Sequence, residues 1–437
     1  MRSFVTPKSA LKMRGASAAL AIALAMGTVV GVTGFADTAH AQKKDKKAKP
    51  SYSKEYIAVY KPIEDAVNAE PTAVATVKGS IPALIAASIS ADEKLATGNI
   101  LYNGGVKSQD QALQLQGMNL MLGSGLVPAE NIGQYNIVGY QLANALKDTA
   151  LSRTFLKAAI DANYGNETTS TDDLRFVLVE SYFADGMYDE GLAAFKNAIA
   201  IRKASGQMIK EDWYKRGLSV AYKAKQVPGV YEIIAMWLPE YQSPGNWRDS
   251  INIARNLNDY KAPEMLDLLR LSNRVSAMQN KMEYIDFIEA ADPRRLPKEV
   301  ETVIEQGYAS GVVSRDDIYV ADSLKTAKTR MTADRADLPA LEKDARAASA
   351  SLRTVSAAGD AFLNYGEYAK AEEFFQKSLG MPGVDANVAL TRLGIAQAEL
   401  GKYDAALETF GKVTGNRAAI ARLWSIYVAG KKAGATS

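Results

Sequence analysis

Two stretches near the end of the chain decide its fold: AGDAFLNYGEYAKAEEFFQKSL (residues 358–379) and LGIAQAELGKYDAALETFGKVT (residues 393–414). Corresponding residues lie 35 positions apart, as three pairs illustrate: Gly359 and Gly394, Gly366 and Gly401, Phe375 and Phe410. We interpret each stretch as two antiparallel helices, with small residues where the helices approach closely and phenylalanine as a plug toward the next unit. One such hairpin cannot bury its apolar face alone, so repeated units are expected to stack.

The residue order of both stretches resembles the tetratricopeptide (TPR) repeat, with its Leu-Gly pair, Gly-x-Tyr turn, alanine and phenylalanine. Tyr368 and Tyr403 follow the glycine-bearing turn and are expected to open the second helix of each pair. The chain as a whole is also similar to exported TPR proteins of Gram-negative bacteria in three segments: Asn246–Asp249, Leu266–Leu271 and Asp360–Leu363. The first resemblance implies an α-solenoid, and the second brings no established activity with it.

Further copies of the pattern lie upstream. A clear one comprises Leu178, Tyr182, Gly186, Tyr188, Phe195, Ala198 and Ile199, with Gly191 where the family has alanine. Looser copies around Gly98, Gly139 and Tyr222 step by 40 or 41 residues, which exceeds the family norm. We therefore predict TPR-like helical repeats over residues 54–245.

The rest of the chain is also expected to be helical. We predict an irregular helical middle segment over residues 246–350, in which residues 320–352 form one long helix or two with a break at Pro339. C-terminal TPR repeats with a capping helix follow over 351–430, then a disordered tail over 431–437. Because no stretch alternates in the manner of a strand, the predicted fold class is an all-α solenoid of stacked antiparallel helix pairs.

Residues 1–41 are typical of a secretory signal peptide. Arg2, Lys8, Lys12 and Arg14 precede an apolar stretch, and Ala39-His40-Ala41 predicts cleavage between Ala41 and Gln42. An uncleaved membrane anchor is the alternative, although the apolar run is short for a span. Cleavage would place the protein in the periplasm or outside the cell, with no transmembrane span remaining.

Charge and composition exclude several classes of function. The chain has 437 residues, no cysteine and one histidine, His40, which lies in the predicted signal peptide. The mature chain would therefore lack the residues of Ser-His-Asp or Cys-His catalysis and of the usual zinc sites. Removing the signal leaves 48 positive and 48 negative residues, so a nucleic-acid partner is not expected. No cofactor or metal is predicted.

The predicted mature N-terminus is basic. Residues 42–53 are interpreted as a disordered leader, in which Lys43–Lys49 holds five lysines against one aspartate. The leader is either simply solvated or makes weak contact with anionic surfaces of the cell envelope.

Two functions remain open. The first is a non-catalytic scaffold or adaptor that binds a peptide or partner protein, because TPR solenoids take up such ligands in a concave groove lined by the first helices of their hairpins. The family register assigns these groove positions to Phe176, Glu180, Phe183, Arg353, Asp360, Asn364, Thr391, Ile395 and Glu399. The acidic members suit a basic or mixed peptide, or else these positions are merely solvated helix faces. The second function is a carboxylate-dependent envelope enzyme or glycan-binding or glycan-processing factor, which would need a pocket with two converging carboxyl groups of raised pKa.

Overall fold

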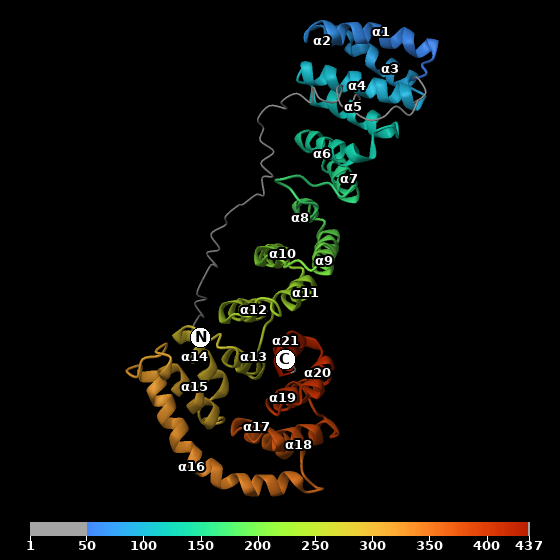
Figure 1. Cartoon of the computed structure of the whole chain (residues 1–437). Helices are drawn as coiled ribbons and strands as arrows, with labels where there is room; N and C mark the ends of the chain where they lie inside the picture. The colour runs from blue at the N-terminus through green and yellow to red at the C-terminus, as the bar shows by residue number, and fades with distance from the viewer. Residues whose placement is uncertain (1–49, 436–437) are drawn as a thin grey trace. The chain divides into compact units, whose positions relative to one another are not determined.

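The computed structural model describes residues 50–435, and within this range it contains helices and no strand (Figure 1). The predicted all-α class is confirmed, with consecutive helices packed in adjacent pairs. The chain divides into two compact units, Met1–Ile209 and Lys210–Ser437. The predicted signal peptide, its cleavage site and Lys43–Lys49 lie outside the described residues.

Unit 1 is built from antiparallel helical hairpins. Its helices are α1 (Lys54–Ala69), α2 (Ala73–Val77), α3 (Ile81–Ala87), α4 (Ala91–Lys107), α5 (Gln111–Gly123), α6 (Ala129–Ala145), α7 (Thr149–Asp161), α8 (Thr171–Ala184) and α9 (Tyr188–Ala204), with the 3-10 turn η2 (Lys78–Ser80). The main pairs are α4 with α5, α6 with α7, and α8 with α9. Successive apolar clusters join these pairs, so that each hairpin buries its apolar face against its neighbours.

Glycines allow α4 and α5 to approach with their backbones almost in contact. A Cβ atom on Gly117 would lie 2.5 Å from the backbone nitrogen of Tyr102 and 2.6 Å from the carbonyl oxygen of Gly98. Neither backbone atom can move aside cheaply, so this crossing requires glycine. Gly123 on the same helix has no such neighbour within 4 Å.

The start of the described chain is tied to α4. The carboxylate of Glu93 accepts hydrogen bonds from the Ser53 backbone N–H (2.8 Å) and hydroxyl (2.8 Å) and from the Ser90 N–H (2.9 Å). Asp92 accepts a bond from the Ser51 N–H at 3.1 Å. Part of the predicted 42–53 leader is therefore held in place, because Ser53 caps α1 while bonding to α4.

Unit 2 contains the two clear repeats. Its helices are α10 (Glu211–Lys223), α11 (Val227–Trp237), α12 (Pro244–Leu257), α13 (Ala262–Arg274), α14 (Lys281–Ala291), α15 (Pro297–Ala309), α16 (Ile318–Arg346), α17 (Leu352–Asn364), α18 (Tyr368–Leu379), α19 (Ala386–Glu399), α20 (Tyr403–Gly411) and α21 (Ala418–Ala435), with the 3-10 turn η3 (Gly415–Arg417). The predicted opening of second helices at Tyr368 and Tyr403 is confirmed by α18 and α20.

The two repeats make equivalent contacts. A Cβ atom on Gly359 would meet the ring of Phe375 at 2.7 Å, and one on Gly394 would meet the ring of Phe410 at 2.6 Å. Both phenylalanines are buried. The Phe410 ring also stacks on Trp424 of α21, with 6.1 Å between ring centres, so the last helix seals the last hairpin.

The structure differs from the predicted segments in three places. The chain divides after Ile209, so α10 and α11 belong with unit 2 although the predicted repeat segment extends to residue 245. Pro339 does not break α16, which continues to Arg346. The terminal helix α21 extends to Ala435, beyond the predicted end at residue 430.

Unit 2 closes on itself. The last helix, α21, contacts α11, α12 and α13, which end more than 140 residues before it begins. The helices α14–α20 therefore lead around α13 and return to it (Figure 1). This closure determines what the inner faces of α17 and α19 can contact.

Candidate partner-binding surfaces

In unit 2, the predicted groove of the C-terminal hairpins is filled by helix α13. Arg274 of α13 forms an ion pair with Glu399 of α19 at 2.6 Å and donates a hydrogen bond to the Tyr368 hydroxyl at 3.0 Å. The side-chain oxygen of Asn364 accepts a bond from the Glu299 N–H at the start of α15 (2.9 Å). The face that the repeat register assigns to a partner is thus occupied by the chain itself.

The centre of this contact is a buried carboxylate. Asp267 of α13 is fully buried, and it accepts hydrogen bonds from Arg270 and from Arg417 of η3, each at 2.6 Å. Arg392 of α19 lies 3.5 Å from the same carboxylate. Trp424 of α21 donates its indole N–H to the Asp267 carbonyl oxygen at 2.9 Å. One residue of α13 therefore joins three segments of the C-terminal region.

Each arginine in the network has an acidic partner. Arg270 makes a bidentate contact with Glu299, at 2.8 and 2.6 Å, and Arg392 contacts both oxygens of Asp360, at 2.6 and 2.9 Å. Charge-assisted bonds of this kind compensate the cost of removing the ions from water only when every partner is present. The network is accordingly sensitive to the loss of a single carboxylate.

Burial and charge have opposite effects on the pKa of two acidic residues at this contact, Asp267 of α13 and Glu399 of α19. Burial alone would raise the pKa of Asp267, but the charges of Arg392, Arg270 and Arg417 hold this pKa below its ordinary value. For Glu399 burial prevails, and its pKa is raised although Arg274 opposes the shift. Asp267 is therefore the carboxylate that the arginines stabilise as an anion.

Several predicted site residues in unit 2 are not available to a partner. Asn364, Thr391 and Ile395 are 3% exposed or less, and the Thr391 hydroxyl donates to the carbonyl of Asn387 within its own helix. The Glu399 side chain is only 15% exposed. The chain itself covers the face that the repeat register predicts as inward, since α15 contacts Asn364 and α13 contacts Glu399. Asp360 is half-buried against Arg392 and Arg353 is exposed.

In unit 1, the two predicted aromatic contacts belong to the core. Phe176 and Phe183 are 9% and 7% exposed. A Cβ atom on Gly191 would lie 2.5 Å from the Phe183 ring, so the glycine that replaces the family's alanine makes room for this ring. Glu180 on the same helix is half-buried. Of the three predicted groove residues on α8, it is the one that a partner can reach.

A comparison of equivalent positions separates the two units. Gly139 of α6 lies against Phe155 in the same way as Gly359 of α17 lies against Phe375, so the two glycines are equivalent. The residue five positions after the glycine is Asn144 in α6 and Asn364 in α17. Asn144 is exposed, whereas Asn364 is buried. Ala184 occupies the equivalent position on α8 and is also exposed. These two positions, one on α6 and one on α8, are therefore exposed within unit 1.

The role of α13 was missed at the sequence level, although it has a local signal. Leu266, Leu268, Leu269 and Leu271 surround the helix instead of forming one stripe, which is typical of a helix buried on all sides. Asp267 and Arg270 stand among them, and charged residues are rarely fully buried unless they are paired. This pattern indicates a buried ion-pair site, but it does not identify the distant partners.

Other features of the described chain bear on function. Among the helices within residues 50–435, none combines the length and apolar character required to cross a bilayer. Over the same range, no three carboxylate side chains converge in the manner of a metal site. No family model matches the chain, and no curated protein is similar to it.

Proposed function

We propose that the protein is a non-catalytic scaffold or adaptor of the bacterial cell envelope that binds a helical or extended segment of a partner protein. The observation that carries this proposal is α13 on the inner face of α19, where Glu399, at a predicted groove position, contacts Arg274 of that helix. Helix-in-groove binding is a recurring mode of peptide recognition. The TPR resemblance of the repeats supports the same interpretation.

The proposed site for an external partner is the inner face of α6 and α8 in unit 1. There the positions equivalent to Asn364 are occupied by the exposed residues Asn144 and Ala184, and Glu180 is half-buried nearby along α8. In unit 2 the acidic residue at this face, Glu399, forms an ion pair with Arg274 of α13. By analogy with this contact, we expect the partner segment at the corresponding face of unit 1 to carry arginine or lysine.

The proposed location in the cell envelope rests on the sequence of residues 1–41, in which a positively charged segment is followed by an apolar segment and then by an Ala-x-Ala motif. Cleavage after Ala41 would leave the protein periplasmic or secreted. N-terminal sequencing of protein from fractionated cells checks this part, and an intact Met1 would contradict it.

Site-specific crosslinking tests the proposed binding face. A photoreactive amino acid is placed at Asn144 or Ala184, and at exposed Lys157 on α7 as a control. We expect a discrete crosslinked protein in the envelope fraction from the first two positions and none from the control. Equal labelling from all three positions, or labelling from Lys157 alone, would refute the assignment.

The alternative of a carboxylate-dependent envelope enzyme or glycan-processing factor receives less support. Glu342 and Glu367 line a common pocket, but each lies 2.8 Å from the ammonium group of Lys370. The hydrogen bond from Lys370 lowers the pKa of Glu342. An acid catalyst requires the opposite shift, so the geometry favours the scaffold.

A further inference from the structure

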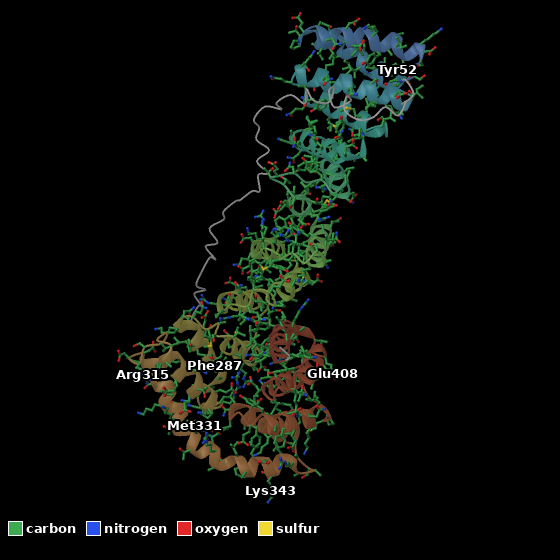
Figure 2. The ribbon with its side chains drawn as sticks, in the orientation of Figure 1. Tyr52, Phe287, Arg315, Met331, Lys343 and Glu408 are labelled. Atoms are coloured by element: carbon green, nitrogen blue, oxygen red, sulfur yellow. The ribbon has the colours of Figure 1, made fainter. Side chains whose placement is uncertain are left out.

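Helix α16 is incompletely packed against the body of unit 2 in its middle, where Tyr365 donates a hydrogen bond to Asp334 at 2.9 Å. Its buried residues are Val320, Ser323, Ala327 and Ala345, with none between the last two. Met331, Leu338 and Leu341, which occupy the intervening apolar positions, are only half-buried. Figure 2 shows Lys343 on this helix pointing away from α17 and α18. The apolar positions of this stretch are therefore incompletely covered.

Both ends of α16 are fastened. Lys328 contacts Glu305 of α15 at 2.9 Å, near the beginning of the incompletely covered stretch. At the other end Lys377 of α18 donates to the carbonyl oxygens of Ala345 and Ala347, at 2.7 and 3.0 Å. Because these contacts hold the helix on either side, the space between it and α17–α18 is a defined feature of the fold.

This space is a cavity of about 360 Å³. Leu338 and Pro339 of α16 form an apolar wall, and Tyr365 at the end of α17 lies opposite. Cavities that bind small ligands begin at about 300 Å³. The cavity therefore has room for one or two residues of a peptide and not for a long segment.

The charges around the cavity are paired, with one exception. Lys370 lies 2.8 Å from both Glu342 and Glu367, and Glu342 also contacts Arg346 at 2.8 Å. The structure gives Arg335 no ion pair within residues 50–435. Its guanidinium carbon lies 5.4 Å from the centre of the Tyr365 ring, which orients the group at the cavity. A ligand would therefore meet an available guanidinium group.

The cavity thus combines a donor fork for a carboxylate, from Arg335, with an apolar wall that includes the ring of Pro339. The C-terminus of a peptide with an apolar last side chain presents the two complementary groups.

We propose that the cavity between α16 and α17–α18 binds the C-terminal carboxylate of a partner protein whose last residue is apolar. Arg335 holds the carboxylate, and Leu338, Pro339 and the Tyr365 ring contact the terminal side chain. This site adds to the proposed scaffold function, because it lies in unit 2 and does not involve the inner face of α6 and α8. Crosslinking from Asn144 and binding at this cavity can fail independently.

Fluorescence polarisation with the full mature protein tests the proposal. The probe is fluorescein-labelled Gly-Ser-Gly-Ala-Leu with a free carboxylate, compared with the same peptide as a C-terminal amide. We expect the free acid to bind at least tenfold more tightly than the amide. Equal binding of the two peptides, or no binding of the acid, would overturn the proposal.

Two variants and a control locate the site. Arg335→Gln, at an exposed position, is expected to weaken binding of the acid at least tenfold, and Leu338→Trp is expected to fill the cavity and abolish binding. Arg315→Gln is the matched control, because Arg315 also lies over a tyrosine ring, that of Tyr308 at 4.5 Å, but away from the cavity. Circular dichroism verifies that each variant is folded. Unchanged binding by folded Arg335→Gln, or displacement by octanoate as effective as by the unlabelled peptide, would overturn the assignment to a peptide C-terminus.

Discussion

Replacing Asp267 with asparagine is expected to destabilise unit 2 strongly while leaving unit 1 unaffected. The substitution preserves shape but removes the negative charge that Arg270 and Arg417 contact at 2.6 Å and Arg392 approaches at 3.5 Å. Removing one partner from a buried ion pair costs about 3–5 kcal/mol, because the remaining charges stay buried without compensation. We expect a cost in this range for the free energy of unfolding of unit 2.

Tryptophan fluorescence during urea unfolding measures this effect in unit 2 alone, because all four tryptophans lie there and all are buried: Trp213, Trp237, Trp247 and Trp424. With a urea dependence of about 3 kcal/mol per molar for a unit of this size, the midpoint should fall by about 1 to 1.7 M. Far-UV circular dichroism, which reports both units, should then separate into two transitions. Glu408→Gln is the control, since its ion pair with Lys412 is at the surface (Figure 2).

The pH dependence gives a second, independent signature. The pKa of Asp267 is lowered in the folded state, so its contribution to stability is present above the unfolded pKa of about 3.9 and is lost as the pH falls through the folded value. The difference in stability between wild type and Asp267→Asn should therefore be largest near pH 6 and should narrow below pH 4. If the free energy of unfolding of Asp267→Asn at pH 6 lay within about 0.5 kcal/mol of the wild-type value, the role assigned to α13 would be refuted.

Three further outcomes are expected. Gly117→Ala should lower the melting temperature of unit 1, followed by tyrosine fluorescence, because the added Cβ atom would collide with the α4 backbone. Gly123→Ala on the same helix is the control and should be neutral or stabilise by up to about 1 kcal/mol. Equal effects of the two substitutions would contradict the close crossing of α4 and α5. Phe410→Ala should cost about 3–5 kcal/mol and shift the Trp424 emission, and a neutral result would contradict the repeat register. Glu93→Gln should cost unit 1 about 1–3 kcal/mol near neutral pH. Because bonds from the Ser53 and Ser90 N–H groups lower the Glu93 pKa to about 2, that cost should shrink as the pH falls from about 4 toward 2, and a pH-independent cost would contradict this origin.

Local pattern was sufficient for much of the fold. The 35-residue step places glycine against phenylalanine in both C-terminal hairpins, because that contact joins residues 16 positions apart within one unit. The helix starts at Tyr368 and Tyr403 follow from the same turn. Because these contacts join residues that are close in the sequence, they recur as a repeated sequence pattern, and the helix starts could be predicted from that pattern.

The candidate site could not be predicted to the same extent. The register identifies which face of α17 and α19 turns inward, but it says nothing of what lies on that face. The contact between Asp267 and Arg417 joins positions 150 residues apart. No sequence pattern around either residue indicates that the other is its partner. The prediction consequently treated Asn364 and Thr391 as accessible, whereas α13 or the core covers them.

The return of α21 to α13 also constrains how this chain can change in evolution. An open array of hairpins tolerates duplication or deletion of a unit, because each unit depends on its immediate neighbours. In unit 2, inserting or removing one hairpin between α14 and α20 would carry Arg417 and Trp424 away from Asp267. The number of hairpins in this unit is therefore fixed by geometry, and length variation among descendants of the chain should accumulate in unit 1, where the principal contacts join neighbouring helices.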